Sequence, residues 1–180
     1  MKIIRVTEAG DNTPAIDFLP DSTLLRRGYP MFYPDFGSGW SIEPYLAVRL
    51  SRLGKGVSLK FATRYYDAVA PAIRLILPGA PAVMQGALSG MDFSVSHGDW
   101  RTPAEYLEAG SITIQDVEIP LPSSTEEIDR IIPHVSRLTT IKMGDIVLLP
   151  LVAQPIPVGP RSRIKAMTPD GTEVMDVKVV

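Results

Sequence analysis

Cysteine is absent from the 180-residue sequence, and histidine occurs only twice. Without cysteine the chain can have neither a disulfide framework nor a thiolate zinc site. The absence is neutral about the cellular compartment. Two histidines can supply at most two imidazole ligands, which argues against a histidine-based metal site.

Long runs of one character are missing as well. No stretch approaches the roughly 20 uninterrupted apolar residues that a membrane-spanning helix requires. The N-terminal run turns polar at Thr7, so no signal-peptide core is predicted. The net charge is −2 and no long basic run occurs, which argues against a nucleic-acid surface. We therefore expect a cytoplasmic protein whose partners include neither a membrane nor a nucleic acid.

Proline and glycine, in contrast, are abundant, with 17 and 14 residues. Proline cannot donate a backbone hydrogen bond to a sheet and it interrupts helices, so the chain is cut into short segments. Apolar residues make up 45% of the sequence, which is enough for one packed core at this length. The composition predicts a single domain over residues 1–180, mostly β (α+β), with strands joined by fixed turns.

The stretch from Asp35 to Asp67 holds the best candidate for a functional site. A turn-rich entry leads into a predicted strand, Ile42 to Ser51, which is followed by a glycine turn and a short helical segment. Alternate residues of a strand point to the same face of a sheet. We therefore expect the side chains of Glu43 and Tyr45 to share one space.

A second candidate residue lies in the next apolar run, Val69 to Leu77. Its length and branched residues predict a buried strand, with Pro71 indicating a bulge or an edge position. Arg74 is the one charge in this run, and a buried guanidinium without an anionic partner is costly. We expect Glu43 to be that partner. A structural salt bridge is the favoured interpretation, and ligand binding is the alternative.

The rest of the chain alternates between strands and turns. Further strands are predicted at Lys2–Val6, Ser111–Ile119, Ile146–Val152, Ser162–Ala166 and Glu173–Val180. A hairpin turn is expected at Pro169-Asp170-Gly171, because these residue types favour turn conformations. His97 and Asp99 suggest a metal pair or a dyad, but no other carboxylate–histidine grouping supports them. We interpret that segment as a polar surface turn.

One helix is predicted after the middle of the chain. Its apolar stripe consists of Ile128, Ile131, Ile132 and Val135. Ser123 and Ser124 each precede a glutamate by three residues, a spacing typical of a capping box at a helix start. Pro133 lies inside the stripe and is expected to kink or shorten the helix.

Taken in order, these segments resemble one known family. The resemblance is carried by the following series: Pro20-Asp21-Ser22-Thr23-Leu24-Leu25, Pro30-Met31-Phe32-Tyr33-Pro34-Asp35-Phe36, the Glu43 strand, Gly54-Lys55, Lys60-Phe61-Ala62-Thr63-Arg64-Tyr65-Tyr66-Asp67, Val135 to Asp145, and Ile164 to Val180. This order is similar to that of the fumarylacetoacetate hydrolase superfamily, in its catalytic-domain form. The match covers most of the chain and is weakest from about Pro78 to Pro122.

The resemblance implies a fold, an assembly and a chemistry. The fold would be a rolled mixed β-sheet or β-sandwich with a few short helices, paired as a homodimer. Family members commonly hold Mg²⁺ or Mn²⁺ and hydrolyse, isomerise or decarboxylate β-keto or enol acids. The metal acts as a Lewis acid that stabilises the developing enolate.

Most of the family's functional residues are replaced in this sequence. Its Glu-x-Glu metal motif falls on Glu43-Pro44-Tyr45, so the second carboxylate has become tyrosine. Its next metal-binding aspartate falls on Arg74, which reverses the charge. The histidine expected shortly after Val6 is absent from Thr7–Asp11. The resemblance therefore implies no catalytic residues, no metal ligands beyond Glu43, and no cofactor.

Three hypotheses about function follow. In the first, the metal-dependent reaction is lost and the chain survives as a binding or structural homodimer, with Glu43, Tyr45 and Arg74 holding a small acidic ligand. In the second, it is an active hydrolase, isomerase or decarboxylase with Mg²⁺ or Mn²⁺, acting on a β-keto or enol acid such as an acylpyruvate or 2-hydroxyhepta-2,4-diene-1,7-dioate. Asp92, His97 and Asp99 would then reach the space near Glu43. In the third, the chain pairs with an intact homologue as a mixed dimer.

Overall fold

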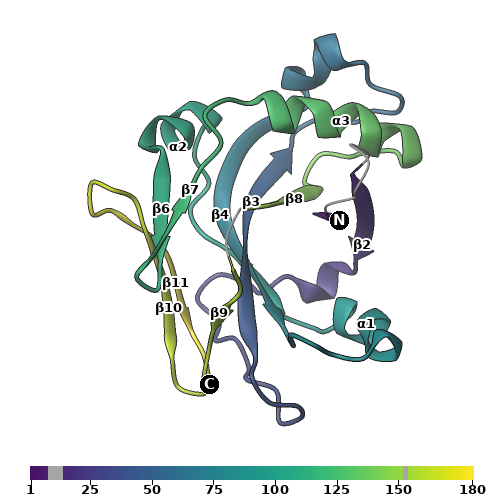
Figure 1. Ribbon diagram of the computed structural model, residues 1–180. Coiled ribbons are helices and arrows are strands. Elements are labelled where there is room, and N and C mark those ends of the chain that lie inside the picture. Colours follow the sequence, from purple (N-terminus) through teal and green to yellow (C-terminus); the bar gives the residue numbers. More distant parts are fainter. Residues whose placement is uncertain (8–13, 152–153) are drawn as a thin grey trace.

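The computed structural model describes residues 1–7, 14–151 and 154–180, which form two β-sheets and a few short helices (Figure 1). The larger sheet has seven strands in the order β2-β1-β8-β3-β4-β5, with β9 also paired to β3. The bounds are β1 Ile3–Thr7, β2 Ala15–Leu19, β3 Ser41–Leu50, β4 Tyr66–Ile76, β5 Val95–His97, β8 Ile146–Pro150 and β9 Ile156–Pro157. The predicted mostly β fold with few helices is confirmed.

The smaller sheet has four strands in the order β11-β10-β6-β7. Its strands are β6 Ser111–Ile114, β7 Val117–Pro120, β10 Arg163–Met167 and β11 Glu173–Lys178. The helices are α1 Ala82–Ser89, α2 Pro103–Ala109 and α3 Glu126–Leu138, with 3₁₀ turns η1 Asp21–Thr23 and η2 Leu59–Arg64. Figure 1 shows the smaller sheet beside β3 and β4, and α3 across the upper end of the molecule. Within the described ranges, no helix is long and apolar enough to cross a bilayer.

Strands β3 and β4 form the centre of the larger sheet. They pair antiparallel from Ser41 opposite Ile76 to Arg49 opposite Ala68, and the register shifts only after Arg49. The predicted edge position of Pro71 is wrong, because β4 lies between β3 and β5, and no bulge occurs opposite β3. On the other side the regular β4–β5 pairing ends at Ala72, and the next bridge, Val69 with Arg101, is shifted by one residue. Proline has no backbone N–H, so the carbonyl is the only backbone group of Pro71 that needs a partner. That carbonyl accepts a hydrogen bond of 2.8 Å from Gly98 N.

The larger sheet is buried on both faces. Even-numbered residues of β3, such as Leu46 and Val48, belong to a main core that also contains residues of the smaller sheet and the apolar stripe of α3. Odd-numbered residues such as Ala47 belong to a second cluster with Ile3 and Leu148. Alternation along the strand thus places Glu43 and Tyr45 on the side of the second cluster.

The predicted helix is present as α3, and its four predicted apolar residues are buried. The predicted capping box is wrong: the N-cap is Thr125, without a side-chain capping bond, while Ser124 Oγ accepts a bond from Glu126 N at 3.3 Å. The helix also continues through Pro133 to Leu138 instead of ending there. The chain's capping box is found elsewhere, at Thr102 with Glu105, at the start of α2.

The predicted strand Ser111–Ile119 is two strands, β6 and β7, paired as a hairpin. Gln115 and Asp116 between them both have positive φ, 46° and 66°, the conformation of a tight hairpin turn. The β10–β11 hairpin is confirmed, with Gly171 at φ 83° in its turn. Val152, the end of another predicted strand, and residues 8–11, in the segment where the family histidine was sought, lie outside the described residues.

The segment 24–33 connects the outer strands of the two sheets. At one end Leu25 N donates to Val95 O of β5 at 2.7 Å. At the other, Met31 N donates to Lys178 O of β11 at 2.8 Å, and Tyr33 N donates to Val180 O at 2.7 Å. Because β5 and β11 each end their sheet order, this segment closes the edge of both sheets.

Candidate functional site

Glu43 and Tyr45 share one space, as the strand periodicity predicts. The hydroxyl of Tyr45 donates a hydrogen bond of 2.7 Å to Oε2 of Glu43. Tyr45 is almost fully buried, while 35% of the Glu43 side chain is exposed. Burial, and after it the negative charge of Glu43, raises the pKa of Tyr45 well above its ordinary value. The phenol is therefore neutral at physiological pH, and its single O–H is the donor in the bond to Glu43.

Arg74 lies opposite Glu43 in the β3–β4 register. Its Nη1 atom is 3.8 Å from Oε2 of Glu43, so the predicted salt bridge is confirmed. Its Nη2 atom donates a long bond of 3.4 Å to Leu88 O, and its Nε atom has no partner among the described residues. Only 6% of the side chain is exposed. A guanidinium has five N–H donors, so this buried group has unused hydrogen-bonding capacity.

A second arginine at this place was missed from the sequence. Arg5 on β1 forms an ion pair with Asp17, which lies opposite it on β2. Its side chain is 16% exposed, and its Nε atom also lacks a partner among the described residues. The register from β1 through β8 to β3 brings Arg5 to the face that carries Tyr45. The sequence feature that could have indicated it is the single charge of Arg5 within the branched apolar run Ile3–Val6.

The two guanidinium groups are close enough to affect each other. Burial, and next the positive charge of Arg5, lowers the pKa of Arg74 from its ordinary value. For Arg5 burial is the largest influence and lowers the pKa, yet the hydrogen bond to Asp17 and the negative charge of Asp17 leave the pKa raised. Arginine stays protonated at neutral pH in either case. Two cations and a phenol thus converge beside one carboxylate.

The residues of the metal-dependent hypothesis lie elsewhere. His97 ends β5, partly buried, with its ring centroid 4.6 Å from that of Trp100, so describing it as a surface turn was wrong. Burial lowers the pKa of His97. Asp99 pairs with Arg27 at 2.7 Å, and Asp92 is exposed. None of the three forms a hydrogen bond or ion pair with Glu43.

The donor set beside Glu43 does not fit a divalent cation. Mg²⁺ and Mn²⁺ prefer several oxygen ligands, and carboxylates supply most of the protein's share. Here the nearest partners of Glu43 are a phenol and a guanidinium, and the guanidinium repels a metal ion. In the ranges that the structure describes, no three His, Asp or Glu side chains form a group able to hold a metal.

Two surface cavities are both lined in part by Arg26 and Tyr29. One, of about 310 Å³, is apolar and is lined by residues including Leu25, Phe32 and Phe93. The other, of about 290 Å³, is lined by polar and charged residues including His97 and Asp99. Glu43 lines neither of them, so these cavities are separate from the arginine cluster.

Comparison with known proteins finds relatives in structure only. No sequence profile of a known family matches the chain, and no curated protein matches it in sequence. A protein described as a fumarylacetoacetate hydrolase family member from Yersinia pestis CO92 has a TM-score of 0.78 and 21% identity, over 99% of this chain and 93% of that one. The 5-carboxymethyl-2-hydroxymuconate delta-isomerase of Mycobacterium smegmatis has a TM-score of 0.80 and 16% identity, over 99% and 78%.

A third solved structure contains ligands. The fumarylpyruvate hydrolase of Pseudomonas aeruginosa, in complex with Mn²⁺ and pyruvate, has a TM-score of 0.77 and 13% identity, over 100% of this chain and 89% of that one. Similarity at such identities concerns the arrangement of strands and helices and not the chemistry. The resemblance in the sequence is confirmed at that level: the chain has the fold of the fumarylacetoacetate hydrolase family.

Proposed function

We propose that this protein binds a small acidic ligand without a metal ion, as a homodimer that has lost the metal-dependent chemistry associated with its fold. The observation that carries the proposal is the state of Arg74. Its side chain is 6% exposed, its contact with Glu43 is 3.8 Å long, and its Nε has no partner among the described residues. A buried guanidinium with unused donors favours an oxygen-rich anion as its partner.

The charges around Arg74 favour a ligand that brings acceptors. Arg5 and Arg74 face the carboxylates of Asp17 and Glu43, so the cluster is neutral in total. Its hydrogen bonding is nevertheless incomplete, because both arginines keep a buried Nε without a partner in the described chain. A carboxylate or a keto acid offers several acceptor oxygens in a planar arrangement that suits a guanidinium. The phenol of Tyr45 can contribute a further polar contact.

The loss of metal chemistry is supported by the side chains that replace the ligands. Lewis-acid catalysis requires an open metal site held by oxygen or nitrogen donors. Arg74 places a fixed positive charge where the family resemblance expects an aspartate. In the Pseudomonas relative both Mn²⁺ and pyruvate are bound. In this chain we propose that an acidic ligand is retained and that arginine substitutes for the ion's charge.

Calorimetric titration of the purified chain tests the proposal. Pyruvate and oxaloacetate serve as probes, each in chelator and then with added Mn²⁺. We expect at least one of them to bind in chelator, and Arg74→Met to weaken that binding roughly tenfold or more. Arg130→Met is the matched control, because Arg130 is exposed on α3 and pairs with Glu126. Micromolar binding of Mn²⁺ by the unaltered chain would count decisively against the proposal.

The alternative, a working metal-dependent hydrolase, isomerase or decarboxylase, has its own test. Turnover of an acylpyruvate or of oxaloacetate is measured with added Mg²⁺ or Mn²⁺ on folded protein. Turnover above the background rate would support the alternative and exclude the loss of chemistry. Sedimentation at low concentration checks the homodimer, and co-purification of an intact homologue would point to a mixed dimer instead.

A further inference from the structure

Two segments distant in sequence contribute positive charges and no negative ones to the surface. Residues 51–65 and 134–144 contain six Lys or Arg side chains and neither Asp nor Glu. All six cations are exposed: Arg52, Lys55, Lys60, Arg64, Arg137 and Lys142. We call these two segments the basic face. In the described part of the chain, none of these six cations forms an ion pair with a carboxylate.

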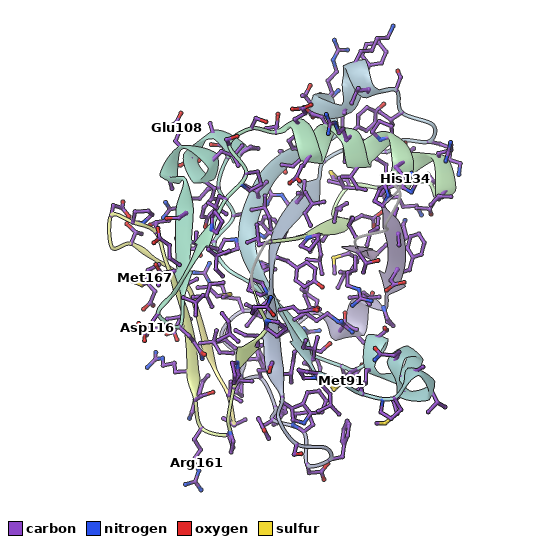
Figure 2. All side chains as sticks on the ribbon, in the orientation of Figure 1. Met91, Glu108, Asp116, His134, Arg161 and Met167 are labelled. Atoms are coloured by element: carbon purple, nitrogen blue, oxygen red, sulfur yellow. The ribbon has the colours of Figure 1, made fainter. Side chains whose placement is uncertain are left out.

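Backbone contacts hold the two segments together. Gly54 and Ile141 exchange two hydrogen bonds, of 3.0 and 2.9 Å, and Gly56 N donates to Ser136 O at 2.9 Å. The Nζ atom of Lys55 donates to Arg137 O at 3.1 Å. In Figure 1 the blue helical turn η2 lies above α3 at the upper end of the molecule, and Figure 2 marks His134 on the same helix. The six cations therefore occupy one end of the protein.

The charge of the chain is strongly divided. The full sequence has 18 cations and 20 carboxylates, so the remaining 12 cations outside the basic face stand against all 20 carboxylates. The face carries +6, and the rest of the chain carries −8. A net charge of −2 conceals this separation. Such a surface attracts a polyanion that comes within about one Debye length, and the attraction turns the basic face toward the polyanion.

The basic face also exposes large apolar side chains. They are Leu53 at 70% exposure, Leu59 at 57%, Phe61 at 39%, Leu138 at 55% and Met143 at 78%. They come from a loop, a 3₁₀ turn, a helix end and a second turn, and they alternate with the cations along the chain. Neither of the two surface cavities includes any of them. These side chains therefore protrude between positive charges.

We propose that the basic face docks onto the surface of a bilayer that contains anionic phospholipid. Cations interact there with lipid phosphates, while aliphatic side chains enter the boundary between headgroups and acyl chains. A nucleic acid fits less well, because base stacking requires an open aromatic ring. Phe61, at 39% exposure, is the face's one exposed aromatic ring, and the charged groups of Lys60 and Arg64 lie 4.9 and 5.0 Å from its centroid. The other four apolar side chains are aliphatic.

The proposal departs from the expectation that no membrane is a partner. That expectation used the absence of an apolar span and of a continuous basic run. Peripheral binding requires neither, because folding can assemble the charges from separate segments. Here the two segments are about 80 positions apart and contribute four and two cations. Docking by this face is independent of ligand binding at Arg74.

Vesicle co-sedimentation of the full chain tests the proposal. The probes are vesicles of phosphatidylcholine alone and vesicles of phosphatidylcholine with phosphatidylglycerol. We expect binding to the anionic vesicles only, weakening as salt is raised. The variant Lys60→Glu/Arg64→Glu should lose roughly tenfold or more of the vesicle affinity. The variant Leu53→Ser/Met143→Ser should weaken binding and leave its salt dependence in place.

Matched controls place the same changes elsewhere. Arg161→Glu/Lys178→Glu reverses two exposed cations outside the basic face, and Figure 2 shows Arg161 at the end opposite His134. Val83→Ser removes an apolar side chain that is 88% exposed on α1. Both controls should bind anionic vesicles like the unaltered chain. Circular dichroism confirms that each variant is folded.

Three outcomes would overturn the proposal. The first is no sedimentation of the folded chain with anionic vesicles at low salt. The second is equal loss of binding in the control variants, which would make the effect one of total charge. The third is evidence that the face serves another partner. Tighter binding of a single-stranded or duplex oligonucleotide than of vesicles would assign it to a nucleic acid. Salt-sensitive self-association through the same residues would assign it to a second copy of the chain.

Discussion

Arg74 lies directly opposite Glu43 in the register of β3 and β4, with its Nη1 atom 3.8 Å from Oε2 of the glutamate. Glu43→Gln removes the one anion near this buried guanidinium, so we expect a loss of about 1–2 kcal/mol in the free energy of unfolding. Arg74→Met removes the buried charge itself. It should therefore lower the free energy of unfolding less than Glu43→Gln, which leaves that charge unpaired. Urea unfolding of both single variants and the double variant gives the coupling between them. Additive losses would mean that the pair does not interact.

The same register allows a carboxylate metal site to be designed. Tyr45→Glu with Arg74→Asp places three carboxylates, including Glu43, on adjacent strands of one sheet. We expect the double variant to bind Mn²⁺ and its melting temperature to rise when Mn²⁺ is added, because the ion relieves carboxylate repulsion. Tyr45→Glu alone keeps Arg74 and should show no such rise. Absence of Mn²⁺ binding by a folded double variant would argue that three carboxylates at these positions do not suffice to hold the ion.

Tyr66 at the start of β4 connects the larger sheet to α3, because its hydroxyl donates to Asp129 at 2.8 Å. Burial is the main reason that its pKa is raised from 10.0 to about 12. A group with a raised folded pKa stabilises the protein fully below the unfolded pKa and loses that contribution as pH rises. The free energy of unfolding should therefore fall between about pH 10 and 12. Urea unfolding across this range should show a smaller fall for Tyr66→Phe; an identical fall would exclude this cause.

Asp145 joins the N-terminus to the turn before β8. Its carboxylate accepts bonds from Lys2 N at 2.8 Å and Lys142 N at 2.9 Å, and it pairs with Lys2 Nζ at 2.8 Å. Its side chain is 2% exposed, so Asp145→Ala should cost about 3–5 kcal/mol by leaving buried partners unpaired. The exposed pair of Asp176 and Arg163 is the control, and Asp176→Asn should change stability little. Guanidinium unfolding measures both; equal effects would contradict the explanation.

Gly98 lies where β5 leaves the larger sheet and approaches β11. A Cβ atom there would lie 2.3 Å from Val174 O and 3.0 Å from a ring carbon of Pro71. Gly98→Ala should destabilise the protein by about 2–3 kcal/mol, because two backbone segments must separate. Gly86 on α1 has open space around it, so Gly86→Ala should stabilise by roughly 0.5–1 kcal/mol. Thermal unfolding distinguishes the two, and a neutral Gly98→Ala would show that the approach can relax.

The sequence predicts best those elements whose periodicity is local. The β3 strand and the shared face of Glu43 and Tyr45 follow from an alternation of two, and the stripe of α3 follows from a helical period. The partnership of Glu43 with Arg74 was predictable because one charge interrupts a buried run. These inferences require only neighbours in sequence and the cost of burying a charge.

Other features depend on contacts between distant segments. Arg5 reaches the site because β1 pairs in parallel with β8, about 140 positions later, and no local pattern indicates that pairing. The turn at Gln115 and Asp116 has positive φ without glycine, so the usual hairpin signal is missing. The capping box at Thr102 and Glu105 has the expected spacing, but the polar-turn interpretation of His97–Pro103 ends where this helix begins, and no helix is predicted there.

The segment 24–33 gives the protein a built-in reporter of its own opening. The amides of Leu25 and Met31 donate to the outer strands β5 and β11, and the amide of Tyr33 donates to Val180, just beyond β11. Exchange of these hydrogens with solvent deuterium requires the segment to leave at least one sheet. Exchange of all three at the slow rate of the central β3 amides would mean that the sheets separate only when the whole chain unfolds. Faster exchange at one end would identify which sheet edge opens first.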